Sequence, residues 1–235
     1  MNSNADQPKV HGISFVTVIA RGVRKLTHPI KYNSLTIVLS TLFIVCISAQ
    51  SLASWRLQNE ILAAHGQASV SYWVNLSTGA FLEGLATNWQ AAFLQLASLV
   101  LFSGFLYQRG APHSRDPLKA TSRKKTRKDA RRFTWVYRNS FFLAFLLLFV
   151  VSLSLHIVFG AKAYNEERAL TGQPSISITT FILSAKFWSS TLQTWQAEYL
   201  AIALFVVLSP FLRQEGSAES KPTGSSDETT GEANR

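Results

Sequence analysis

Two ionisable side chains, His156 and Glu198, lie within or at the edge of long apolar stretches, where such groups are rare. An ionisable group in a membrane span is costly and often marks a path for protons or ions. If the two stretches are neighbouring antiparallel helices, the imidazole and the carboxylate lie at similar depth and could bind a proton or a cation. With the polar Gln50, they form a candidate polar site. The alternative is that Glu198 lies among headgroups and His156 is a hydrogen-bonded packing residue.

Other patterns typical of enzymes are missing from the sequence. We find no acid pair, His-x-x-x-His spacing, nucleophile elbow or glycine-rich phosphate loop. A lone cysteine, Cys46, excludes an internal disulfide and a cysteine-based metal site. The other histidines are spread over both sides of the predicted membrane, at His11, His28, His65 and His113. We therefore expect no enzyme, no catalytic residue, no metal and no cofactor.

Four apolar blocks without charge must position the candidate site: 35–54, 91–108, 139–160 and 199–212. A bilayer core of about 30 Å needs roughly 20 apolar residues of helix. The fourth block is shorter, so its helix must begin earlier, through Trp195 and Glu198. A soluble helical protein is the alternative, but such blocks would leave it little polar face. The sequence therefore predicts four transmembrane helices.

Basic residues are distributed unevenly around these blocks. Of the 23 lysines and arginines, all but Arg56, Lys162, Arg168 and Lys186 lie before the first block, between the second and third, or after the fourth. The positive-inside rule makes that side cytoplasmic, so both termini are predicted to be cytoplasmic. No cleavable signal peptide is evident, and the first block is expected to be a retained anchor.

The middle loop contains a strongly basic run, SRKKTRKDARR, that leads into the aromatic residues Phe133, Trp135 and Tyr137. A basic run could bind nucleic acid. The aromatic belt favours a membrane surface instead, where each basic residue gains about 1 kcal/mol from anionic lipids. We therefore predict the bilayer and anionic lipids as partners and no nucleic acid, with a lipid-facing basic loop of Arg123, Lys124, Lys125, Arg127, Lys128, Arg131 and Arg132.

The chain matches itself when shifted by 106 positions. Asn59-Glu60 aligns with Asn165-Glu166, and Trp89 aligns with Trp195. Shared hydrophobicity does not explain such matches in loops, so we interpret them as a duplication. Each unit has two spans, so both units start from the cytoplasm and are related by a pseudo-twofold axis along the membrane normal.

The predicted fold is an all-α membrane protein of two tandem, parallel-repeat helical hairpins with short outer interfacial helices. The first and third spans should continue outward to left-handed turns at Gly66 and Gly172. Serines at 69 or 71, and at 175 or 177, should cap the short helices. The matched residues form an outer-face motif, with the tryptophans interpreted as interfacial anchors: Asn59, Glu60, Asn165, Glu166, Trp89 and Trp195.

Five segments follow from this organisation. Residues 1–32 form a cytoplasmic N-terminal segment, either amphipathic or disordered. The hairpin repeats span 33–110 and 139–216, joined by the basic loop 111–138. Residues 217–235 are polar and lack aromatics, so a disordered cytoplasmic tail is expected.

Several stretches resemble a family of small bacterial membrane proteins catalogued as a domain of unknown function, number 6766. They are YNEERALTGQPSIS, FWSSTLQTWQAEYL and FLRQEGSAESKP. The resemblance covers residues from about 33 to 222 and departs from the family pattern at Ala92 and Glu215. It implies a multi-pass protein of the bacterial inner membrane and no known activity.

Two function classes remain open. The first expectation is a structural or accessory role through lipid or protein contacts, including a homodimer. The alternative is a small transporter or channel with a polar site near His156 and Glu198. A continuous polar stripe through the spans would favour transport, but the inner halves offer mainly Ser40, Thr41, Ser103 and Ser209.

The orientation can be tested with a reporter enzyme that is active only outside the cytoplasm. Fused after residue 70, it should be active, and after residue 118 it should be silent, because the basic middle loop is retained inside. The opposite pattern of activity would overturn the topology.

Overall fold

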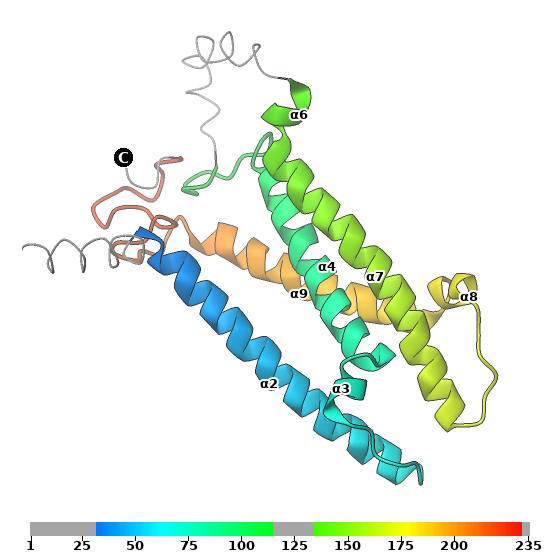
Figure 1. Ribbon diagram of the computed structural model, residues 1–235. Coiled ribbons are helices and arrows are strands. Elements are labelled where there is room, and N and C mark those ends of the chain that lie inside the picture. Colours follow the sequence, from blue (N-terminus) through cyan, green and yellow to red (C-terminus); the bar gives the residue numbers. More distant parts are fainter. Residues whose placement is uncertain (1–31, 115–133, 232–235) are drawn as a thin grey trace, which may run out of the picture. The chain divides into compact units, whose positions relative to one another are not determined.

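The computed structural model describes residues 32–114 and 134–231, and these residues form helices joined by turns without any strand. The four long helices are α2 (Ser34–Ala64), α4 (Gly79–Phe102), α7 (Ser140–Leu170) and α9 (Ala185–Leu208). Three short helices accompany them: α3 (Tyr72–Asn75), α6 (Trp135–Arg138) and α8 (Ile178–Ile182) (Figure 1). All four long helices are long and apolar enough to cross a membrane, which confirms the predicted all-α class with four spans.

Local sequence signals set where the helices begin and end. Gly66 and Gly172 both adopt a φ of 68° after α2 and α7, as predicted for left-handed turns. Ser71 and Ser177 are the caps of the short helices α3 and α8, accepting hydrogen bonds from Val74 N and Thr180 N. At 31 residues, α2 and α7 are each about 46 Å long, so they extend beyond a bilayer core of about 30 Å.

The two halves of the chain repeat the same local devices. The bounds of α7 and α9 follow those of α2 and α4 by the same 106 positions. The Asn59 amide bonds both the N–H and the carbonyl of Val70, and the Asn165 amide does the same with Ile176. These amides hold the turn after each first helix in place. The twofold relation of the halves in space stays a prediction.

The chain divides into two units, Met1–Gln58 and Asn59–Arg235. The first unit contains most of α2, whose large apolar side chains are mainly exposed, as expected for a helix facing lipid. In the second unit, α4 packs closely along α7 and also contacts α9 (Figure 1).

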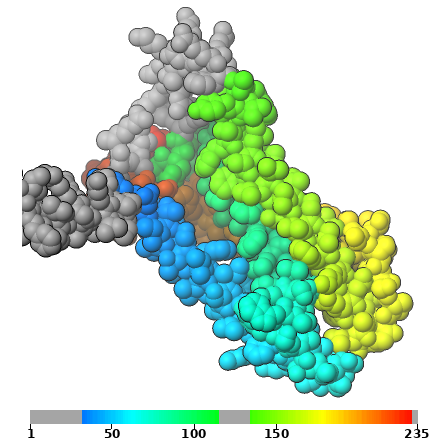
Figure 2. Space-filling view, viewed as in Figure 1, coloured from blue at the N-terminus to red at the C-terminus, as the bar shows by residue number. Residues whose placement is uncertain are grey.

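A small apolar cluster joins α7, α8 and α9. It consists of Ala161, Phe181 and Phe187, each almost fully buried. Figure 2 shows the α8 region, in yellow, packed against the end of α7. This cluster holds the start of α9 against α7.

Small residues allow α4 to approach its neighbours closely. Ala86, Ala91 and Ala97 are buried, as is common where membrane helices meet. The closest approach is at Gly79, where a Cβ atom would lie 2.3 Å from the backbone nitrogen of Ala163. The register of α4 on α7 therefore depends on a glycine at the start of α4.

We expect Gly79→Ala to lower the stability of the folded protein by about 1–3 kcal/mol, because the new methyl group must push two backbones apart. Thermal unfolding in detergent measures the change. Gly224→Ala is the matched control, since a Cβ at Gly224 meets nothing within 4 Å. Equal melting temperatures for both variants and the wild type would contradict the close packing.

Candidate functional site: a polar seam on α4

One face of α4 carries polar side chains along nearly its whole length. They are Glu83, Thr87, Gln90, Gln95 and Ser98, at spacings that place most of them on one side of the helix. Thr87, Gln90 and Ser98 are buried, and Gln90 is completely so. We call these residues and their partners on α7 and α9 the polar seam.

At the end of the polar seam near the start of α4, Glu83 faces His156 of α7. The Glu83 Oε1 lies 3.9 Å from the His156 Nε2, and the His156 side chain is fully buried. The Ser190 hydroxyl of α9 lies 3.4 Å from the same nitrogen. Gly160 leaves room first for the Phe181 ring and then for the carboxylate, since a Cβ there would lie 2.8 Å from Phe181 Cζ and 3.3 Å from Glu83 Oε1. Three helices thus meet at His156.

The carboxylate that faces His156 is therefore Glu83, and not the Glu198 suggested by the sequence. Since α9 runs antiparallel to α7, the α9 residue beside His156 is Ser190. Glu198 lies eight residues further along α9, about 12 Å away by helical rise. Gln50, the third predicted residue, is an exposed residue of α2 in the other unit.

Sequence reasoning missed Glu83 because it precedes the charge-free block that defined the second span. The available signal was its spacing: Glu83, Thr87 and Gln90 recur at intervals of four and three residues, which align on one helix face.

The middle of the polar seam consists of hydrogen bonds between α4 and α9. The Trp195 indole N–H donates to Gln90 Oε1 at 3.1 Å, and Gln95 Nε2 donates to the Glu198 backbone oxygen at 3.1 Å. The Ser98 and Tyr199 hydroxyl oxygens lie 3.0 Å apart. Trp195 thus bonds within the protein in addition to any anchoring role at the interface.

Several buried polar atoms of the polar seam have no hydrogen-bond partner among residues 32–114 and 134–231. They are Thr87 Oγ1, Gln90 Nε2, His156 Nδ1 and Thr191 Oγ1, from three helices. An unpaired polar atom costs several kcal/mol in an apolar environment, and buried water commonly satisfies such groups. The polar seam therefore offers free hydrogen-bonding capacity to water or to a polar ligand.

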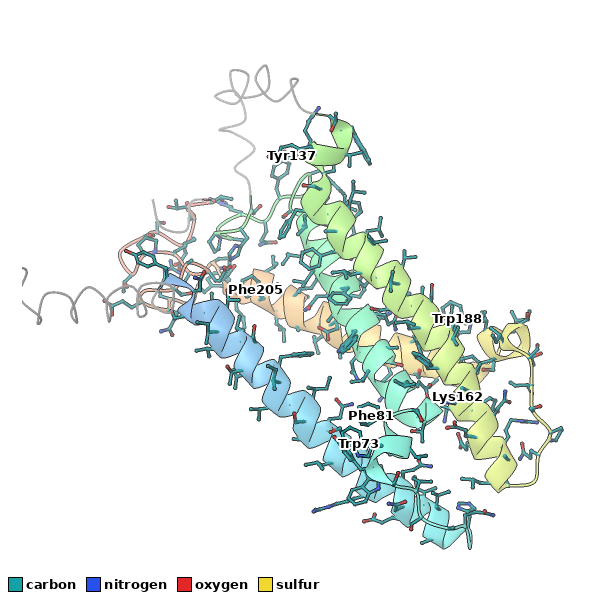
Figure 3. All side chains as sticks on the ribbon, viewed as in Figure 1. Trp73, Phe81, Tyr137, Lys162, Trp188 and Phe205 are labelled. Atoms are coloured by element: carbon teal, nitrogen blue, oxygen red, sulfur yellow. The ribbon has the colours of Figure 1, made fainter. Side chains whose placement is uncertain are left out.

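Charged residues of α7 and α9 also interact with Glu83. Lys186 Nζ lies 3.1 Å from Glu167 Oε2, and both residues interact electrostatically with Glu83. Nearby, Glu166 Oε2 accepts the N–H of Gly79 at 2.9 Å, a favourable position for an anion at a helix N-terminus. Lys162 of α7 bonds the Ser77 carbonyl beside the start of α4 (Figure 3).

The remaining predicted residues have varied environments. Asn59, Asn165 and Glu166 hold turns and helix starts, and Glu60 is exposed. Trp89 is half-buried in α4. The basic-loop residues Arg123 to Arg132 lie outside the described residues. Within the described ranges, no group of three or more His, Cys, Asp or Glu side chains could hold a metal ion.

Comparison with known proteins gives a family but no activity. A family model described as "Domain of unknown function (DUF6766)" matches residues 26–232, nearly the whole chain. No curated protein and no solved structure matches the chain. The match agrees with the residues on which the resemblance was based, and the chain belongs to this family of unknown function.

Proposed function

We propose that this membrane protein conducts protons along the polar seam, with the Glu83–His156 pair as the group that takes up the proton. The observation that carries the proposal is the contact between Glu83 and the fully buried His156 where α4, α7 and α9 meet. Ionisable residues inside membrane bundles mark proton relays in many pumps and transporters. Imidazole and carboxylate groups both exchange protons readily near neutral pH when their environments shift them.

The remaining polar seam supports a path beyond the ion pair. Thr87, Gln90 and Thr191 have spare hydrogen-bonding capacity that water can fill. Beyond them, the Ser98–Tyr199 contact continues the polar contacts toward the ends of α4 and α9. In the predicted bacterial inner-membrane orientation, Glu83 faces the outside and the Ser98 end faces the cytoplasm.

An accessory role through lipid or protein contacts remains the alternative. The polar seam favours transport because structural helix contacts in membranes are made well enough by small residues and occasional hydrogen bonds. They do not need a carboxyl group that faces a buried histidine.

Proton flux into vesicles that contain the reconstituted protein and a pH-sensitive dye tests the proposal. Under an imposed membrane potential, we expect Glu83→Gln and His156→Gln each to reduce the flux at least about tenfold, as is typical for loss of a proton-transfer group. Glu60→Gln makes the same chemical change at an exposed carboxylate and should leave the flux unchanged.

Two results would contradict the proposal. If wild-type vesicles leak no faster than protein-free vesicles, the accessory role stands. If Glu198→Gln abolishes flux and Glu83→Gln does not, the pair suggested by the sequence is the functional one.

A further inference from the structure

An apolar cavity of about 500 Å³ lies where α4 and α9 end, beyond the Ser98–Tyr199 contact. Its walls are mainly aliphatic and aromatic, with Leu99, Phe102, Ile202 and Val206 among them. The loop after α4 lies over it through Tyr107 and His113, and the His113 ring stacks on Phe205. The volume is typical of a small-molecule site, and the lining suits a hydrocarbon chain.

His113 lines this cavity, and Arg109 and Arg213 follow its lining residues Gln108 and Ser209 in the loops after α4 and α9. Each of the three residues contacts an acidic side chain of the C-terminal tail. Arg109 lies 3.1 Å from Glu228, and His113 lies 3.2 Å from Glu219. Arg213 lies 2.7 Å from Asp227. The tail thus supplies three carboxylates to three basic groups that lie near an apolar cavity.

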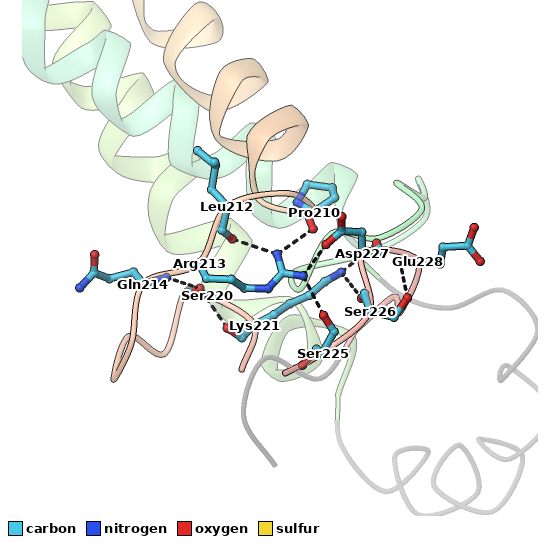
Figure 4. Close-up of polar contacts among 10 residues, drawn as sticks. All are labelled: Pro210, Leu212, Arg213, Gln214, Ser220, Lys221, Ser225, Ser226, Asp227 and Glu228. Atoms are coloured by element: carbon cyan, nitrogen blue, oxygen red, sulfur yellow. Dashed lines mark hydrogen bonds and ion pairs between the residues drawn. The ribbon is translucent and has the colours of Figure 1, made fainter. Parts of the chain in front are cut away.

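The tail was expected to be disordered, but residues 217–231 make defined contacts. Lys221 is almost fully buried and donates to the carbonyls of Ser226 and Asp227 (Figure 4). Burial, together with the charge of Arg213, lowers the pKa of Lys221. The composition suggested disorder because the contacts of the tail with Arg109 and Gly110 depend on partners that are distant in sequence.

Gly110 allows the tail to pass close to the loop after α4. Its φ is 81°, and a Cβ there would lie 2.3 Å from the Asp227 carbonyl oxygen. Its N–H donates to Thr230 Oγ1 at 2.9 Å, and the Gly231 N–H donates to the Ala111 carbonyl. Residues 225–231 therefore lie against the loop that borders the cavity.

We propose that the cavity binds one acyl chain of an anionic phospholipid, with the lipid phosphate on Arg109, His113 and Arg213, and that the acidic tail competes for these groups. The charges match, because the tail places carboxylates where a phosphate would sit. The apolar cavity beside them favours a lipid over a soluble phosphate. On the predicted topology this end faces the cytoplasmic leaflet, which carries anionic lipid.

The Arg109–Glu228 pair is weak enough to be displaced, because its side chains are 76% and 75% exposed and ion pairs with this exposure contribute little to stability. In the Arg213–Asp227 pair, the carboxylate is 59% exposed and the Arg213 side chain is only 14% exposed. Attachment to the same chain gives the tail a high effective concentration, so neutralising it should raise lipid affinity.

Native mass spectrometry tests the proposal by measuring lipid affinity. The full chain in detergent is mixed either with phosphatidylglycerol or with phosphatidylcholine that has the same acyl chains, and the bound lipid is detected after the detergent is removed. Wild type should bind phosphatidylglycerol more tightly. The double variant Asp227→Asn, Glu228→Gln should gain about fivefold or more in that affinity, since each freed basic group favours anionic lipid by about this factor. Glu60→Gln, a charge loss elsewhere, should not change it.

Two variants address the cavity and its mouth. Ala203→Phe fills the cavity and should abolish the preference, and the exposed Arg109→Gln should weaken it. Equal binding of both lipids by wild type and the tail variant would overturn the proposal. If wild type and Ala203→Phe bind glycerol 3-phosphate equally well, the basic residues form a phosphate site that does not use the cavity. That result would also overturn the lipid proposal.

Discussion

The buried contact between Glu83 and His156 is the interaction around which the second unit is organised. In a bilayer, a polar side chain must find its partners within the protein, because lipid provides none. Glu83 and His156 satisfy this requirement only if α4 and α7 hold a fixed register, and Gly79 and Gly160 provide the space for that register. The polar face of α4 then meets α9 through Gln90, Gln95 and Ser98.

The two halves of the chain share local features at positions 106 residues apart, but they do not share the polar seam. Both halves use the same asparagine clamp and the same glycine turn. Both also use the same serine bond after the second helix, from Gln108 N to Ser114 and from Gln214 N to Ser220. His113 and Glu219, which are equivalent positions, pair with each other. The pair of ionisable residues is not repeated, because the positions that correspond to His156 and Glu83 are occupied by Gln50 and Ser189.

The sequence was sufficient for features that depend on nearby residues. The four spans, the turns at Gly66 and Gly172, and the caps at Ser71 and Ser177 all follow from local composition and backbone preference. The sequence did not identify the partner of His156, because the identity of that partner depends on how three helices are aligned along one another. It was also insufficient for the tail, whose order depends on Gly110, Arg109 and Arg213.

Proton conduction requires water to reach the polar seam, and the reactivity of introduced cysteines measures whether it does. Replacing Cys46, the only cysteine, by serine gives a background in which single cysteines can be placed at Thr87 and Ser98 of the seam, and at the exposed Leu96 and Leu101 of the same helix. A small water-soluble thiol reagent needs the thiolate, which forms in water and not in lipid. We predict modification at positions 87 and 98 and protection at positions 96 and 101. Protection at 87 and 98 in a folded protein would show that the seam is dry and would contradict a role in proton conduction.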